Sequence, residues 1–318
     1  MERSVFEPKV TIVIPVYNGS NYLKNAIECA LGQTYENLEV IVVNDGSNDG
    51  GATAAIARSF GNQITYYEKL NGGVSTALNY GIARMTGDYF SWLSHDDAYA
   101  PTKIADAVEL LSQLPHGREN TIAYTEGHYI GADGASLKPF PARLEANRFY
   151  SGKEMVRISL EKGTLNGCCM LIPRSAFERC GGFNEQLRYS QDTLMWQTMF
   201  LEGFGLVSDE KDNVMYRLHN AQVSQTRHDL FEKDSVTIAG ILAPRLVQCG
   251  DGLLYLYAQR MARYNCAHVV ELLRNAARAA QPFTPVQELQ LRLRLLFGRF
   301  RSQAKYLYYR HVLRVNVK

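Results

Sequence analysis

The chain has 318 residues, with 34 Lys and Arg against 32 Asp and Glu, 46% hydrophobic residues and six cysteines. This composition is that of an ordinary globular protein and excludes disordered, collagen-like and coiled-coil chains. A net charge of +2 argues against a dedicated nucleic-acid-binding protein. The cysteines show no CxxC pair, and no apolar run approaches the ~18 residues of a membrane span. We therefore expect free thiols and a cytoplasmic location.

Strand-like and helix-like segments alternate over the first hundred residues. β-Branched or aromatic runs at 10–14, 38–43, 64–67 and 89–93 predict strands, and the segments between them have helical character. Strands separated by helices of about ten residues predict βαβ units and a parallel sheet with helices on both faces. Ligands of such sheets bind at the carboxyl ends of the strands.

Each predicted strand is followed by polar residues. The clusters are Tyr17-Asn18, Asn44-Asp45, Asn71-Gly72 and His95-Asp96-Asp97. Neither the dinucleotide fingerprint GxGxxG nor the phosphate loop GxxxxGK[ST] is present. Carboxylates bind a phosphate well through a bridging divalent cation, and Asp45 is suited to accept hydrogen bonds from a base or ribose. The pattern therefore predicts a site for a metal-bound nucleotide.

An ordered set of motifs resembles the family 2 glycosyltransferases. The motifs are Val10–Gly19, Val40–Ser47, Asn71–Asn79, Gly87–Asp97, Asn166-Gly167, Cys180–Glu185, Gln191-Asp192 and Tyr216–His219. The resemblance covers about residues 9–225. It implies the GT-A fold, a Rossmann-like and mostly parallel sheet flanked by helices. It also implies transfer of a sugar from a nucleotide-diphosphate sugar with inversion.

The resemblance assigns one group of residues to the nucleotide and the donor sugar: Pro15, Tyr17, Asn18, Asp45, Asn71, Gly72 and Asp96. Within this group, Asp45 would contact the base. A turn at 44–47 whose Asp caps the next helix stays open as the alternative. Asn166 and Gly167 align with a loop on the acceptor side.

A divalent Mn²⁺ or Mg²⁺ ion is the implied cofactor. The resemblance implies that two residues bind this ion: Asp97, as the last carboxylate of a DxD motif, and His219. His95 stands where many relatives carry an acidic residue, so dependence on the metal is expected to be weaker. The alternatives are a solvated acidic turn at 96–97 and an ordinary packed histidine at 219.

Asp192 is the predicted catalytic base, at the start of a helix-like run at 193–201. An inverting transfer needs one base to take the proton of the acceptor hydroxyl. The alternative is a carboxylate favoured there by the helix dipole alone. Gln191 replaces a Glu, and Leu78 an Arg, that many relatives carry.

The last third of the chain is helix-favouring and basic. Residues 245–318 hold 13 Lys and Arg against 3 Asp and Glu. Helical spacing puts two sets of apolar residues on two faces: Leu289, Leu293, Leu296, Phe300 and Leu307 on one, and Leu291, Leu295, Tyr306, Tyr309 and Leu313 on the other. We expect a catalytic domain at 1–228 and a helical region at 229–318 that contacts an anionic membrane surface or a second copy in a homodimer.

The sequence thus predicts a metal-dependent, inverting, non-processive glycosyltransferase of polysaccharide biosynthesis, peripheral on the inner face of the membrane. It would move a sugar, from UDP as the expected nucleotide, to a hydroxyl of a glycan or lipid-linked oligosaccharide. No QxxRW motif of a processive synthase is present. Two alternatives stay open. His95, Leu78 and Gln191 favour a degenerate sugar-nucleotide-binding protein, and a nucleotide-sugar hydrolase would use the same donor site without an acceptor.

Overall fold

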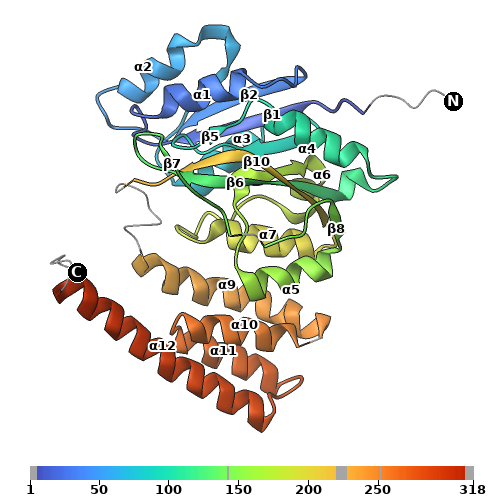
Figure 1. Cartoon of the computed structure of the whole chain (residues 1–318), viewed down its shortest axis with the longest axis vertical. Coiled ribbons are helices and arrows are strands. Elements are labelled where there is room, and N and C mark those ends of the chain that lie inside the picture. Colours follow the sequence, from blue (N-terminus) through green and yellow to red (C-terminus); the bar gives the residue numbers. More distant parts are fainter. Residues whose placement is uncertain (1–5, 142, 220–227, 251, 312–318) are drawn as a thin grey trace. The chain divides into compact units, whose positions relative to one another are not determined.

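The computed structural model describes residues 6–141, 143–219, 228–250 and 252–311, with side chains omitted at 228–229 and 299–311. The chain divides into two compact units. The sheet unit comprises Met1–Met155 and Thr164–His228, and the helical unit comprises Val156–Gly163 and Asp229–Lys318. Figure 1 shows the elements of both units in sequence colours.

The first half of the sheet unit is parallel, as predicted. β1 (Val10–Val16) lies between β2 (Leu38–Asn44) and β4 (Tyr89–Trp92), and β3 (Thr65–Glu68) pairs with the far side of β2. All seven residues of β1 are buried, because this strand has neighbours on both edges and helices against the sheet. The run of β-branched residues suits such a position.

The second half makes the sheet mixed. β9 (Met170–Pro173) runs antiparallel between β4 and β6 (Thr121–Ile130), and β6 pairs in parallel with β10 (Gly205–Arg217). The strand order is β3-β2-β1-β4-β9-β6-β10-β5. The short strands are β5 (Ala98–Tyr99), β7 (Ser136–Pro139) and β8 (Arg148–Tyr150).

Helices flank this sheet (Figure 1). In α1 (Leu23–Leu31) the buried residues recur at helical spacing: Leu23, Ala26, Ile27 and Ala30. The other helices whose bounds begin in the sheet unit are α2 (Ala52–Ser59), α3 (Val74–Ile82), α4 (Lys103–Ser112), α5 (Gly152–Lys162), α6 (Arg174–Cys180) and α7 (Gln191–Leu201). Single turns of 3₁₀-helix form η1 (Gly61–Gln63), η2 (Arg118–Asn120) and η3 (Gly167–Cys169).

The helical unit contains α9 (His228–Cys249), α10 (Leu253–Arg263), α11 (Ala267–Arg278) and α12 (Pro285–His311). The predicted C-terminal helical region is thereby confirmed. Of the second apolar face expected on α12, Leu291 is fully buried; the side chains after residue 298, and Leu313, lie outside the described residues. In the described part of the chain, no helix combines the length and the apolarity needed to cross a membrane. All six cysteines are free thiols, as expected.

Candidate active site

The turn that follows β1 packs against the end of β4. Asn18 adopts a left-handed conformation (φ 49°), and its side chain exchanges two hydrogen bonds with Asn48, at 2.7 and 2.9 Å. Gly19 lies directly against the ring of His95, where a Cβ atom would collide with it. Tyr17 is 43% exposed beside this turn. The turn therefore presents an accessible aromatic ring at the carboxyl edge of the sheet.

Asp45, at the end of β2, organises the loop that leads into α3. Its buried carboxylate accepts a hydrogen bond from Lys69 Nζ at 2.6 Å and from the backbone N–H groups of Gly72 and Gly73 at 3.0 and 2.7 Å. The Asn71 side chain donates to the Asp45 carbonyl oxygen at 2.9 Å. Three predicted donor-site residues, Asp45, Asn71 and Gly72, are therefore in contact.

The alternative reading of Asp45 as the cap of the next helix is wrong. The carboxylate that binds the first turn of α2 belongs to Asp49, whose Oδ2 accepts from the N–H and the hydroxyl of Thr53 at 3.0 and 2.6 Å. Asp45 instead lies at the start of α3, where a negative charge is favoured by the helix dipole.

Arg188 reaches this same loop from the segment before α7. Its Nη1 donates to the carbonyl oxygen of Gly72 and lies where a side chain of residue 73 would be. Gly73 has a φ of 92°, a left-handed value that favours glycine. Leu78, which replaces an arginine in the family pattern, is fully buried in the core. Sequence reasoning missed Arg188, because its partner is 116 residues away.

Asp96 and His219 form a direct pair. Asp96 Oδ2 lies 3.0 Å from His219 Nε2, and both side chains are largely shielded from solvent. The ring of Tyr22 packs against that of His219, with centroids 5.2 Å apart. His95 bonds to the carbonyl of Pro15, and burial lowers the pKa of its imidazole. The pair thus links the end of β4 to the residues that follow β10.

Asp97 has different surroundings. It is 2% exposed; its Oδ1 accepts from the backbone N–H of Arg217 at 2.9 Å, and its Oδ2 accepts from the thiol of Cys168 at 3.4 Å. Burial and, secondarily, the charge of Asp96 raise the pKa of this carboxyl well above its usual range. The resemblance implied that Asp97 and His219 bind the metal together, whereas the structure shows a hydrogen bond between His219 and Asp96.

The Asp96–His219 pair fits a divalent ion that also binds phosphate. Within the described ranges, no cluster of three or more His, Cys, Asp or Glu residues is arranged to hold a metal by itself. Mg²⁺ in nucleotide sites commonly takes one or two carboxylates and completes its shell with phosphate oxygens and water. Asp96 Oδ2 and His219 Nε2 lie a hydrogen-bond length of 3.0 Å apart, so one carboxylate and one imidazole are available side by side for such an ion.

Asp192 lies in the first turn of α7 and is half-buried. Its Oδ1 accepts from the backbone N–H of Thr193 at 2.6 Å, and the Thr193 hydroxyl lies 2.8 Å from that of Thr164. The helix dipole favours the ionised carboxylate at this position. Because Arg188 precedes Asp192 by four residues and contacts Gly72, the segment that carries the predicted base is joined to the Asn71–Gly73 loop.

The Asn166-Gly167 loop packs between two tryptophans. Asn166 Oδ1 accepts from the N–H of Cys168 at 2.9 Å, and Gly167 lies so close to the indoles of Trp92 and Trp196 that a Cβ would come within 2.7 and 2.9 Å of them. Both indole N–H groups are buried without a hydrogen-bond partner among the described residues. Buried donors of this kind are usually satisfied by a protein group or an ordered water. The two tryptophans were not singled out from the sequence.

Beneath this loop lies a buried lysine. Lys103 Nζ donates to Ser91 Oγ at 2.7 Å and to the Met170 carbonyl at 3.2 Å, and burial lowers the pKa of its ammonium to about 8. The Tyr99 hydroxyl, next to Ser91, lies 3.0 Å from the carbonyl of Cys168. This network supports the backbone around the predicted acceptor loop from inside the core.

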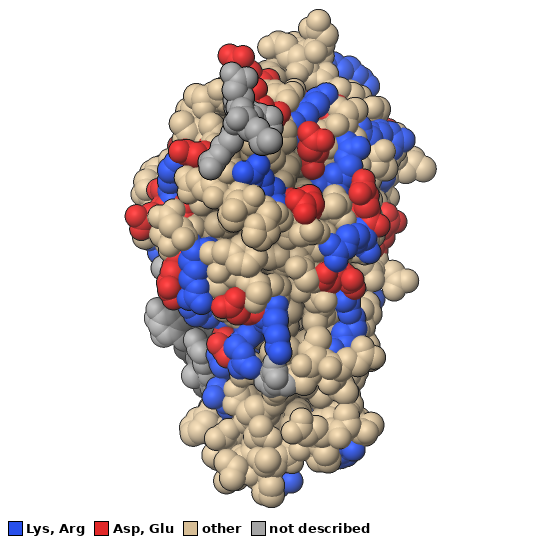
Figure 2. Space-filling model, turned by 90° about the vertical axis from the view of Figure 1, so that its right-hand side faces the viewer, with Lys and Arg blue, Asp and Glu red and all other residues tan. Residues whose placement is uncertain are grey.

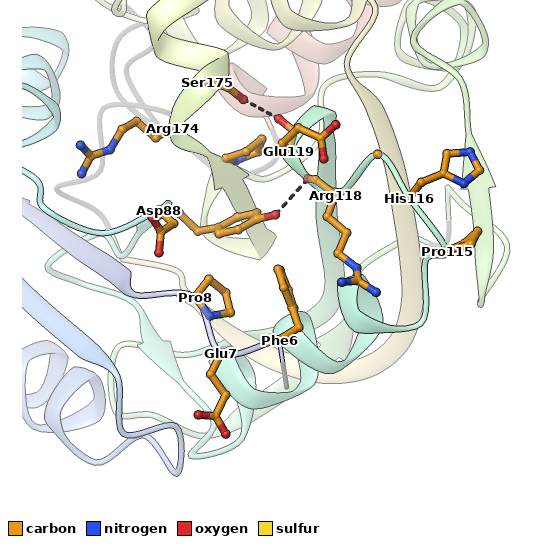
Figure 3. A pocket seen from close by; sticks show the side chains of 13 residues that line it. Phe6, Glu7, Pro8, Asp88, Pro115, His116, Arg118, Glu119, Arg174 and Ser175 are labelled. Carbon is orange, nitrogen blue, oxygen red and sulfur yellow. Dashed lines mark hydrogen bonds between the residues drawn. The ribbon is translucent and has the colours of Figure 1, made fainter. Parts of the chain in front are cut away.

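A cavity of about 520 Å³ lies before the first residues of β1, β4 and β6, lined by Phe6, Tyr89 and Arg118 among others (Figure 3). The Tyr89 hydroxyl donates to the Arg118 carbonyl at 2.9 Å. The guanidinium of Arg118 donates to carbonyls at the end of α4, and Arg174 donates to those of Met85 and Gly87. No predicted site residue lines this cavity, which is therefore separate from the candidate active site.

A family model described as glycosyl transferase family 2 matches residues 11–181, more than half of the chain. An uncharacterized glycosyltransferase of Rickettsia felis is 42% identical over 224 residues, 70% of this chain and 36% of that protein. The chain therefore spans about a third of the length of this relative.

Two solved structures resemble the fold. TarS residues 1–349 of S. aureus, also solved in complex with UDP-GlcNAc, has a TM-score of 0.64 at 15% identity, covering 91% of this chain and 88% of that one. The mannosyltransferase PcManGT of Pyrobaculum calidifontis, in complex with GDP-Man and Mn²⁺, has a TM-score of 0.53 at 17% identity, covering 95% and 87%. These likenesses confirm the predicted GT-A fold.

Proposed function

This chain belongs to glycosyltransferase family 2, and on that premise we propose that it transfers a sugar, with inversion, from a nucleotide-diphosphate sugar to a hydroxyl of a glycan or lipid-linked acceptor. The observation that carries the proposal is the Asp96–His219 pair, at the same strand edge as the loop held by Asp45. TarS, which shares the fold, has been solved with UDP-GlcNAc. UDP is accordingly the first nucleotide to test.

Asp45 and the turn after β1 would bind the nucleoside. Each carboxylate oxygen has about two lone-pair sites for hydrogen bonds. Asp45 Oδ1 accepts from Lys69, Gly72 and, at 3.4 Å, Thr76, whereas Oδ2 accepts from the N–H of Gly73. The second site of Oδ2 would accept an N–H of the base. The exposed ring of Tyr17 offers a surface on which the base can stack.

Asp96 and His219 would hold the Mn²⁺ or Mg²⁺ ion. Such an ion neutralises charge on the diphosphate leaving group. In this assignment Asp97 supports the site from inside, because it holds the N–H of Arg217 while Arg217 Nε donates to the Asp96 carbonyl at 2.8 Å. The Mn²⁺ complex of PcManGT supports the choice of ion.

Asp192 would act as the base in a single displacement. Its carboxylate takes the proton from the acceptor hydroxyl while that oxygen bonds to the anomeric carbon. The bond from the anomeric carbon to the diphosphate breaks in the same step, and the nucleoside diphosphate leaves. Asn166, Gly167 and the indoles of Trp92 and Trp196 would border the acceptor side.

A turnover assay tests the proposal. The purified chain is given a panel of nucleotide-sugars with Mn²⁺, with and without glycan acceptors, and release of nucleoside diphosphate is measured. We expect release that depends on an acceptor, and a product whose anomeric configuration is inverted by NMR. Release without any acceptor would identify a hydrolase. Nucleotide binding without release across the panel would identify a degenerate binding protein.

A further inference from the structure

Helix α12 carries an exposed apolar face on the helical unit. Five large apolar side chains between residues 286 and 297 are 44–67% exposed: Val286, Leu289, Leu293, Leu296 and Phe297. Their spacing of mostly three and four residues puts them on one side of the helix. Leu291 is fully buried, and Gly298 lies against the carbonyl of Ala262 at the end of α10, so the opposite side faces the unit. The apolar face is therefore directed outward.

The charges that accompany this face are basic. The sequence of α12 contains six Lys and Arg and a single acidic residue, Glu288. Glu288 is already paired with Arg274, 2.9 Å away on α11. Arg292 lies exposed within the apolar stretch, and Arg294 is half-buried beside it. Figure 2 shows the charged side chains on one face of the molecule, with Lys and Arg in blue, Asp and Glu in red and the other residues in tan.

We propose that α12 lies on an anionic membrane surface, with its apolar face in the lipid boundary and its arginines against lipid phosphates. An amphipathic helix of low mean hydropathy with basic flanks binds in this manner without crossing the bilayer. Arginine side chains extend from such a face to the headgroups while their alkyl parts stay on apolar surface.

A second copy of the chain is the less favourable occupant. Packing two α12 helices face to face would bring the basic residues of both into one interface, and like charges there are repulsive. The one acidic side chain of each helix is held by Arg274. An anionic lipid surface offers the opposite charge and requires no such pairing.

Vesicle sedimentation of the full chain tests this proposal independently of any sugar transfer. We expect the protein to sediment with vesicles of phosphatidylcholine and phosphatidylglycerol, to stay in solution with phosphatidylcholine alone, and to be released by high salt. The double substitution Leu293→Glu and Phe297→Glu should weaken binding by more than about tenfold. Arg292→Gln should weaken it by about fivefold.

Two controls keep the comparison sharp. Leu137→Glu changes a leucine of β7 that is 55% exposed, and Arg58→Gln removes a charge from a side chain that is 65% exposed on α2. Both should bind vesicles like the parent, and all variants should melt at the parent temperature. Equal binding to the two vesicle types, no binding, or unchanged binding by the α12 variants would overturn the proposal. So would a dimer, seen by light scattering, that Leu293→Glu and Phe297→Glu convert to a monomer.

Discussion

Asp96 Oδ2 and His219 Nε2 lie 3.0 Å apart although the two residues are separated by 123 positions in the chain. This contact joins the turn after β4 to the residues that follow β10. Its neighbour Asp97 takes no part in it, because the Asp97 carboxyl bonds to Arg217 and Cys168. Asp96 and Asp97 therefore have different hydrogen-bond partners, and substitutions at each can test whether their roles also differ.

Asp96→Asn should weaken Mn²⁺-dependent binding of UDP by at least about tenfold. Loss of a residue that only supports a metal ligand already costs about tenfold or more, so loss of a ligand should cost at least as much. Titration calorimetry with UDP, with and without Mn²⁺, measures this.

Asp97→Ala should instead lower the free energy of unfolding by about 1–3 kcal/mol, because it leaves the buried Arg217 N–H without an acceptor. Loss of Mn²⁺-dependent binding in a folded Asp97 variant, with binding kept in Asp96→Asn, would reverse the assignment.

Asp192→Asn should reduce kcat by about 10²–10⁴-fold, the usual contribution of a general base. The affinity for the nucleotide and metal should stay at the parent value, because the proposed nucleotide contacts come from other segments. Steady-state kinetics and calorimetry on the same preparation separate the two effects. A variant that keeps the parent kcat would exclude Asp192 as the base.

Gly73→Ala should raise the KM for the donor, because the new side chain displaces the Arg188 guanidinium from the Asn71–Gly73 loop, which we propose binds the nucleotide. Gly181→Ala is the matched control: Gly181 has a φ of 76° and a ψ of −170°, close to the 92° and 167° of Gly73, yet a Cβ there meets nothing within 4 Å. Both changes place an alanine in the same backbone region, which is essentially restricted to glycine, at a cost of about 1–3 kcal/mol. Similar donor KM values in the two variants would show that Arg188 is dispensable for this loop.

The buried Lys103 predicts a pH dependence of stability. Burial lowers the pKa of its ammonium from 10.5 to about 8, so the unfolded chain binds more protons than the folded chain between these values. Stability from this group therefore rises as pH increases from about 8 to 10.5, by about 3 kcal/mol in total. Chemical denaturation of the parent and of Lys103→Met across this range gives the difference. A difference that does not change with pH would contradict the assignment.

The parallel half of the sheet was predictable because its signals are local. Each β-branched run, such as 10–14 or 38–43, is bounded by turn residues and followed by a helical pattern. β9 was not predicted, since a four-residue buried run gains its strand pairing only from β4 and β6, which are distant in sequence. Its antiparallel direction depends on tertiary packing alone.

The sequence named the candidate residues, but it did not predict the contacts between them. Motif order located Asp45, Asp96, Asp192 and His219, yet which of two adjacent aspartates meets His219 depends on how the turn after β4 orients each side chain. The contact between Arg188 and Gly72 joins segments 116 residues apart, and nothing local signals it. In the sequence, Trp92 and Trp196 have the pattern of ordinary core residues, and only the structure shows that Gly167 packs between them.

The contacts made by Asp45 also bear on the thermodynamics of nucleotide binding. Its carboxylate holds the backbone of Gly72 and Gly73 in place within the protein itself. The loop is therefore ordered as the chain folds, and a nucleotide meets a preorganised surface instead of having to order it. Such preorganisation lowers the entropic cost of association. Nucleotide binding at this edge should consequently proceed with little loss of backbone mobility in the Asn71–Gly73 segment.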